Sequence, residues 1–137
     1  MQAVPLGVGK MDATHREFVE RVVALMKADD ASVGQALAAL AEHLRNHFDE
    51  EREWMTSSGF PSAACHIDEH DAVLRSVDEV QSLVATGELR VARALAFELT
   101  RWFPQHTDAM DRGLAKWMVK ARLGGEPLVF QYGMSRA

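Results

Sequence analysis

The sequence predicts an all-α protein, an up-down-up-down antiparallel four-helix bundle. Two observations support this. Four segments carry apolar residues at steps of three and four, the period of one helix face, and the breaks between the segments are short. Short links favour antiparallel packing of consecutive helices. The whole chain, residues 1–137, is expected to form a single domain.

The first two helices are expected over residues 12–28 and 33–56. The break between them, Asp-Asp-Ala-Ser, combines residue types that stop and start helices. The predicted buried face of the first helix consists of His15, Phe18, Val22 and Leu25. That of the second helix consists of Val33, Leu37, Leu40, Leu44, His47, Glu51 and Trp54. Polar residues therefore interrupt two otherwise apolar faces.

The third and fourth helices are expected over residues 62–85 and 88–122, after breaks that contain Gly59 and Gly87. The third helix should bury Ala63, His66, His70, Val73, Val77, Val80 and Val84. The fourth should bury Val91, Leu95, Leu99, Trp102 and His106. From Gly124 onward, the tail is expected to be irregular. All four helices thus direct histidine towards the common axis.

The composition narrows the class of protein. The chain is 47% hydrophobic and 26% charged, with a net charge of −5 and scattered Lys and Arg, so no nucleic acid partner is expected. Its start lacks the pattern of a secretion signal, and no uncharged stretch is long enough for a membrane span. The lone Cys65 agrees with a reducing compartment. A cytoplasmic location is expected.

The buried histidines and carboxylates call for partners. Burying each such group without a partner would cost about 1–3 kcal/mol, and more for a charge. The total would rival the whole stability of a domain, roughly 5–15 kcal/mol. One buried histidine alone is usually a core residue with a hydrogen-bond partner, but several together with carboxylates indicate a metal site.

The spacing of these residues sharpens the prediction. A step of four keeps His47 with Glu51, and His66 with His70, on one helix face. Each pair alone is a weak signal. His106 and Asp111 are five residues apart, and on an ideal α-helix that step would turn about 140° away from the line. We therefore predict a π-bulge or local unwinding between them, a distortion common at functional sites.

These residues resemble the hemerythrin family, and most closely its single-domain bacterial members, the bacteriohemerythrins. The resemblance covers residues 6–118 and places a residue at all seven ligand positions of the family. It comprises LGVGKMDATHREF around His15, HFDEEREWM with His47 and Glu51, GFPSAACHIDEH with His66 and His70, and WFPQHTDAMD with His106 and Asp111.

The resemblance implies a non-haem di-iron centre with a bridging oxo or hydroxo group. It implies that one iron takes His66, His70 and His106, that the other takes His15 and His47, and that Glu51 and Asp111 bridge them. One position is then left open on the iron with two histidines, where dioxygen would bind. The expected function is reversible dioxygen binding for storage, transport or delivery, with an oxygen-consuming acceptor protein as a possible partner. The chain is not expected to be an enzyme.

Other functions remain open as alternatives. The same centre could serve a redox enzyme that reduces peroxide or nitric oxide or oxidises iron, or a sensor of oxygen or redox state. Zinc is an alternative metal, although seven ligands for two metals fit six-coordinate iron better than tetrahedral zinc.

The sequence also suggests roles for residues near the ligands. The candidates for an apolar pocket wall are Phe48, Trp54, Ile67, Trp102 and Leu114. The hydroxyl of Thr107 faces either the pocket or a neighbouring helix. Cys65 is interpreted as a packing or surface residue, and His43 as a surface residue or a neighbour of a ligand. The acidic residues Asp49, Glu50, Glu53, Asp68 and Glu69 are interpreted as solvated.

Overall fold

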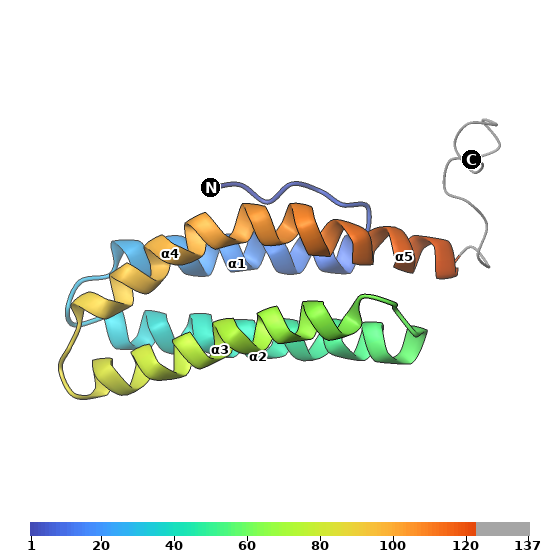
Figure 1. Cartoon of the computed structure of the whole chain (residues 1–137). Coiled ribbons are helices and arrows are strands. Elements are labelled where there is room, and N and C mark those ends of the chain that lie inside the picture. Colours follow the sequence, from blue (N-terminus) through green and yellow to red (C-terminus); the bar gives the residue numbers. More distant parts are fainter. Residues whose placement is uncertain (123–137) are drawn as a thin grey trace.

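The computed structural model describes residues 1–122 and has the predicted all-α fold (Figure 1). The tail from Gly124 onward, predicted to be irregular, lies outside the described residues. The elements in chain order are α1 (Gly9–Lys27), α2 (Val33–Ser58), α3 (Ala63–Ala85), α4 (Arg90–His106), the π-helix η1 (Thr107–Asp111) and α5 (Arg112–Arg122). Because η1 and α5 continue α4, the bundle has four helical arms.

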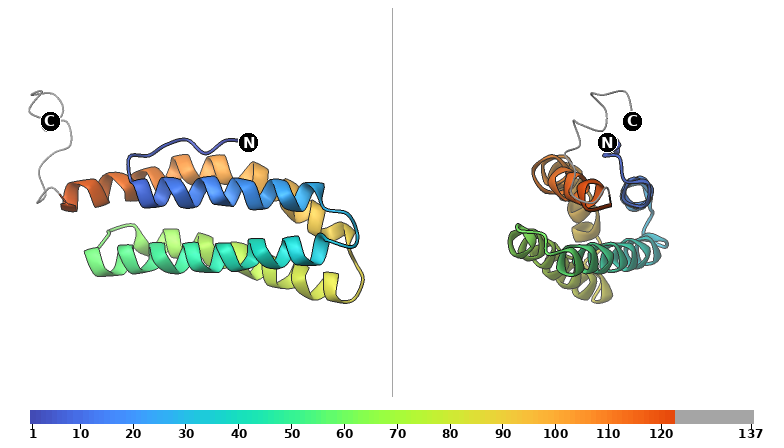
Figure 2. Two further views of the ribbon diagram at one scale, coloured as in Figure 1. Left: turned by 180° about the vertical axis from the view of Figure 1, so that it is seen from behind. Right: turned by 90° about the vertical axis from the view of Figure 1, so that its right-hand side faces the viewer.

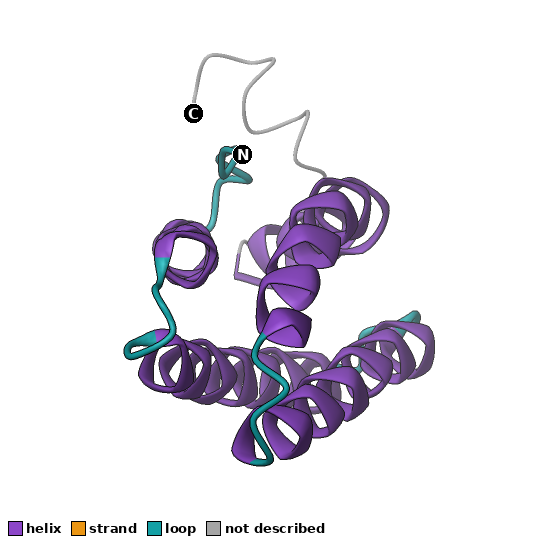
Figure 3. Cartoon of the chain, turned by 90° about the vertical axis from the view of Figure 1, so that its left-hand side faces the viewer, coloured by secondary structure: helices purple, strands orange, loops and turns teal. Residues whose placement is uncertain are grey.

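The arms pack as a four-helix bundle. Each of α1, α2 and α3 contacts the next helix along the chain, and α4 closes the ring by packing against α1 (Figure 2). Seen along the bundle in Figure 3, the arms surround a common axis. Side chains from all four arms can therefore meet at one level of that axis.

Two of the links owe their shape to glycine. Gly59 ends α2 in a left-handed conformation with φ of 69°, and the next residue, Phe60, donates its N–H to the carbonyl of Met55. Gly87 has φ of 98° in the link between α3 and α4. Residues with a Cβ rarely adopt these conformations, whereas glycine does so at little cost.

Several helix boundaries differ from the predicted ones. The first helix begins at Gly9 rather than at residue 12, so Asp12 lies within its first turn. The Asp12 carboxylate accepts the backbone N–H groups of Leu6 at 2.8 Å and Gly7 at 3.2 Å, which precede the helix. The second helix runs two residues further than predicted, and the fourth begins at Arg90 rather than at residue 88.

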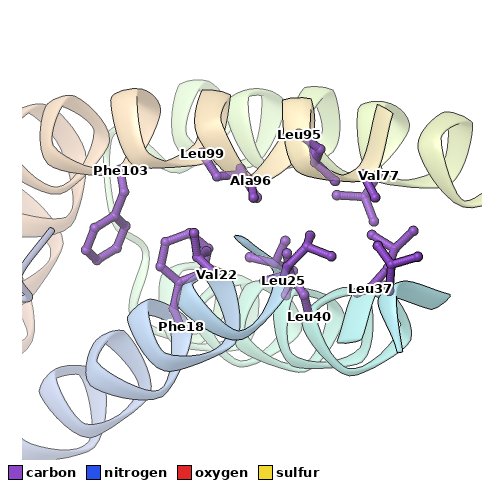
Figure 4. Packing of buried hydrophobic residues seen from close by; sticks show 14 of the residues in the cluster. Phe18, Val22, Leu25, Leu37, Leu40, Val77, Leu95, Ala96, Leu99 and Phe103 are labelled. Carbon is purple, nitrogen blue, oxygen red and sulfur yellow. The ribbon is translucent and has the colours of Figure 1, made fainter. Parts of the chain in front are cut away.

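Two apolar clusters fill the bundle. The larger cluster lies towards the links that follow α1 and α3, and includes Phe18, Leu40, Leu95 and Phe103 (Figure 4). The smaller cluster lies at the other end and consists of Val8, Met11, Met55, Leu114, Ala115 and Val119. Along α1, His15 lies between residues of the two clusters. A polar layer therefore separates two apolar regions of the core.

The buried faces follow the predicted lines with some corrections. All four predicted residues of α1 are buried. On α2 the line ends at Met55, which is fully buried, and Trp54 is half-buried. On α3 the buried members are His66, His70 and Val77, whereas Ala63, Val73, Val80 and Val84 are half-buried. Val91 and Trp102 of α4 are also half-buried. Periodicity gives the direction of a face, but its depth depends on how closely the neighbouring helices cover it.

Within residues 1–122, no helix combines the length and the apolar character that crossing a lipid bilayer would require.

Candidate metal centre

The structure brings all seven predicted ligand residues together between the two apolar clusters. Each arm contributes: His15 from α1, His47 and Glu51 from α2, His66 and His70 from α3, and His106 and Asp111 from α4 and η1. All seven are buried, and none has a relative exposure above 6%. Five of them, Glu51, His66, His70, His106 and Asp111, place one ligand atom each within 4.8 Å of one another. His15, His47 and Glu51 form a second such group.

The π-helix η1 brings Asp111 into the site. The prediction of a π-bulge or unwinding between His106 and Asp111 is confirmed, since residues Thr107–Asp111 are π-helical. The wider turn of a π-helix bonds residues five apart and so places them on one face. The ladder returns to α-helical at Arg112, and Leu114 is again fully buried.

Glu51 lies between the two groups of histidines. Its Oε2 atom is 2.7 Å from Nε2 of His47 and 3.8 Å from Nε2 of His15. Its Oε1 atom is 3.3 Å from Nε2 of His66 and 3.6 Å from Nε2 of His70. One oxygen therefore faces each group.

Asp111 has the same arrangement from the opposite side of the bundle. Its Oδ2 atom is 3.1 Å from Nε2 of His15. Its Oδ1 atom is 2.9 Å from Nε2 of His66 and 3.1 Å from Nε2 of His106. Each carboxylate thus lies between two groups of histidines. One group surrounds a three-histidine position, formed by His66, His70 and His106, and the other a two-histidine position, formed by His15 and His47.

The ionisable side chains of the site shift one another's pKa values. Burial lowers the pKa of His15 and of His66, but the neighbouring carboxylates of Asp111 and Glu51 outweigh it, so both pKa values are raised to about 9. Burial dominates at His70 and lowers its pKa to about 3. Burial also disfavours the charged forms of Glu51 and Asp111, yet the surrounding imidazoles hold both pKa values below their usual range. The site therefore holds two carboxylates ionised inside the protein.

The site has the features of one built for cations. Within residues 1–122, its atoms without a hydrogen-bond partner include Nε2 of His15 and His66, Oε1 of Glu51 and both carboxylate oxygens of Asp111. These are five buried ligand atoms that converge on one place, and leaving them unpaired would be costly. Imidazole nitrogen and carboxylate oxygen are ligands for iron, zinc and related ions. A bound cation would satisfy these atoms together.

Aromatic rings pack against the ligands. Phe48 stacks on His70, with ring centroids 3.8 Å apart and planes at 5°. Trp102 stacks on His106 at 4.3 Å. Phe103 meets His15 edge-on at 5.3 Å, a contact that the predicted pocket wall did not include. Phe103 lies three residues before His106 and therefore on the same helix face, which could have suggested that it packs near the ligands. Leu114, by contrast, belongs to the smaller apolar cluster, which Trp54 and Ile67 flank.

The remaining interpretations have mixed outcomes. Cys65 is exposed, as a surface residue should be. His43 is half-buried beside His47, and its Nε2 lies 3.0 Å from the carbonyl oxygen of Thr14. The hydroxyl of Thr107 is buried without a partner in the described chain, and the residue lines a hollow of about 140 Å³ with Val4 and Phe103. The interpretation of Glu69 as solvated is wrong, because it contacts His106.

Comparison with known proteins agrees with this arrangement. Residues 6–118 match the model of the hemerythrin HHE cation-binding domain. A bacteriohemerythrin of Ralstonia nicotianae is 39% identical, with 87% of each chain covered. Bacteriohemerythrins of Stenotrophomonas maltophilia, at 29% identity with 86% of this chain and 78% of the relative covered, and of Methylococcus capsulatus, at 25% with 77% and 83% covered, are also similar. No solved structure gave a significant match. The chain belongs to the hemerythrin family.

Proposed function

We propose that the chain binds dioxygen reversibly at a di-iron centre, as a binding protein rather than an enzyme. The observation that carries the proposal is the sharing of both carboxylates between two groups of histidines. Such sharing suits two metal ions side by side, since each of Glu51 and Asp111 directs one oxygen to each ion's position. The names of the bacteriohemerythrin relatives support the same function.

In this proposal each residue has a defined task. His66, His70 and His106 would hold one iron, His15 and His47 would hold the other, and Glu51 and Asp111 would bridge them. The position with fewer histidines is where a small ligand would bind. Iron, when bound, would supply the electrons for a reversible interaction with dioxygen, and the protein would supply the ligands, their orientation and a dry surrounding.

The nature of the ligands favours binding over onward chemistry. Ferritin-like di-iron proteins use four glutamates and two histidines, a strongly anionic set. Here five imidazoles, which are neutral when they bind a metal, accompany two carboxylates, and this set should stabilise highly oxidised iron less. The apolar clusters on both sides of the site, with Phe103 against His15 and Phe48 against His70, limit the access of water. A dry surrounding would keep water and protons away from the position where a small ligand binds. An oxygen-consuming protein would be the natural recipient.

The test is the visible spectrum of iron-loaded, reduced protein while oxygen is admitted and then removed with inert gas. We expect a charge-transfer band that appears with oxygen and disappears on purging, through several cycles. Zinc-loaded protein is the control, because zinc has no redox chemistry. Irreversible conversion to an oxidised spectrum in the first cycle would contradict reversible binding and favour a redox enzyme or sensor. The lack of any iron-dependent band would contradict the di-iron assignment.

A further inference from the structure

Glu69 contacts His106 on the side away from the metal centre. Its Oε1 atom lies 2.6 Å from Nδ1 of His106. The same oxygen accepts the indole N–H of Trp102 at 3.1 Å, and the Trp102 ring stacks on the His106 imidazole. Glu69 therefore connects α3 to α4 through two hydrogen bonds to one carboxylate oxygen, and the imidazole is held both at its edge and on its face.

This contact distinguishes His106 from the other histidines of the site. The Nδ1 atoms of His15, His47, His66 and His70 are buried and have no hydrogen-bond partner within residues 1–122. A carboxylate behind a metal-binding imidazole fixes its tautomer and makes the imidazole a stronger ligand. The three-histidine position contains the one imidazole with such support, whereas the two-histidine position contains none in the described chain.

The contact also determines which nitrogen of His106 is free to bind a metal. Because a carboxylate accepts hydrogen bonds, Nδ1 of His106 donates its N–H to Glu69, which leaves Nε2 as the ring nitrogen available to a metal. Nε2 faces inward, 3.1 Å from Oδ1 of Asp111 and 3.0 Å from Nε2 of His70. Glu69 thus holds His106 with Nε2 turned towards the other ligand atoms.

We propose that Glu69 is a positioning residue for His106 and makes the three-histidine position the tighter of the two metal positions. This inference rests on the proposed two-metal centre. The Glu69 side chain is 33% exposed and borders an open hollow of about 530 Å³ with Trp102 and Gln105. Replacing it therefore removes the contact without opening a cavity in the core.

The experiment is a calorimetric titration of the metal-free chain with Co²⁺, an ion that stays divalent in air. We expect the wild-type chain to bind two ions in two steps of different affinity. In Glu69→Ala, the tighter step should weaken by about 10- to 100-fold, the range found when such supporting contacts are lost, and the weaker step should keep its affinity. In the zinc-loaded chain, ¹⁵N NMR should show the Nδ1 proton of His106 exchanging slowly in the wild type and faster in Glu69→Ala.

Two variants serve as controls. Asp68→Ala removes the same charge from the neighbouring, exposed position, and should bind cobalt like the wild type. Glu69→Gln keeps an oxygen that can accept the hydrogen bond from Nδ1, and should keep the slow exchange of that proton but lose part of the affinity. The inference is overturned if Glu69→Ala binds like the wild type, weakens both steps equally, or behaves like Asp68→Ala. A wild-type chain that does not bind two ions would instead refute the proposed di-metal centre.

Discussion

His106 and Asp111 are five residues apart in the chain, yet Nε2 of the histidine lies 3.1 Å from Oδ1 of the aspartate. An α-helix would turn them away from each other, and the π-helical turn of Thr107–Asp111 brings them to the same side. The extra residue of this turn therefore brings a ligand five residues after His106 into a site whose paired ligands on α2 and on α3 are four residues apart. This relationship leads to a test by deletion.

Deletion of Ala109, an exposed residue of the π-helix, should convert the turn to α-helix and leave His106 and Asp111 four apart on one face. We expect the shortened chain to fold and to bind two metal ions. Deletion of Ala94, exposed in the regular part of α4, should rotate everything after it by about 100° and abolish metal binding. Circular dichroism and metal analysis distinguish the two chains. A folded Ala109 deletion without metal would show that the π-turn itself is required.

Shared carboxylates and unshared histidines should respond differently to substitution. Glu51→Ala removes an oxygen from both positions, so it should weaken both cobalt-binding steps. His15→Ala affects the two-histidine position and should leave one tight equivalent. Elemental analysis after dialysis gives the number of ions per chain. One tight ion in Glu51→Ala would mean that Glu51 serves a single position.

The stability of the metal-free chain should be highest near pH 6.5. His15 and His66 have pKa values raised to about 9, so the stability they contribute is full below their unfolded pKa and is lost as pH rises towards 9. His70, with its pKa lowered to about 3, costs stability as pH falls below 6.5, because the unfolded chain takes up its proton first. Glu51 and Asp111 add to the loss at lower pH still, since their pKa values lie below the unfolded ones.

Urea unfolding between pH 4 and pH 9 measures this dependence. Metal-loaded protein is the control, because a metal ion replaces the protons at these imidazoles and should remove the loss of stability towards pH 9. Metal-free protein that becomes steadily more stable from pH 6.5 to pH 9 would contradict the coupling between the imidazoles and the carboxylates.

Phe48 should stabilise the fold as well as the site. It is 4% exposed and stacks on His70, so Phe48→Ala should lower the free energy of unfolding by about 3–5 kcal/mol through the cavity it leaves. Phe97 is 56% exposed, and Phe97→Ala should change stability by no more than about 0.5 kcal/mol. Urea unfolding of the metal-loaded chains compares them. Similar losses in the two variants would contradict a structural role for the Phe48 stack.

The ligand-bearing faces could be predicted from the sequence because they depend on spacing within single helices. His47 with Glu51 shows this, and the mismatch between His106 and Asp111 predicted the π-helix. The contact between Glu69 and His106 could not be predicted in this way, because it joins two helices and depends on how α3 is rotated against α4. In the sequence, Glu69 looks no different from its exposed neighbour Asp68.

How deeply each residue is buried could not be predicted from the sequence either, for the same reason. Val73, Val80 and Val84 share the predicted face with Val77, yet they are half-buried. The spacing within one helix determines which residues share a face, whereas the neighbouring helices determine how deeply that face is buried. Trp54 and Met55 show the finer limit, since a small rotation of α2 decides which of two neighbours enters the core.

The position of Glu51 and Asp111 between the two groups of histidines limits how the centre could be redesigned. A protein engineer who wanted a mononuclear version would have to begin with His15 and His47, because each histidine faces one position. Altering either carboxylate first would disturb both halves at once. By the same reasoning, stepwise divergence within such a chain has an easier path through its histidines than through its acids.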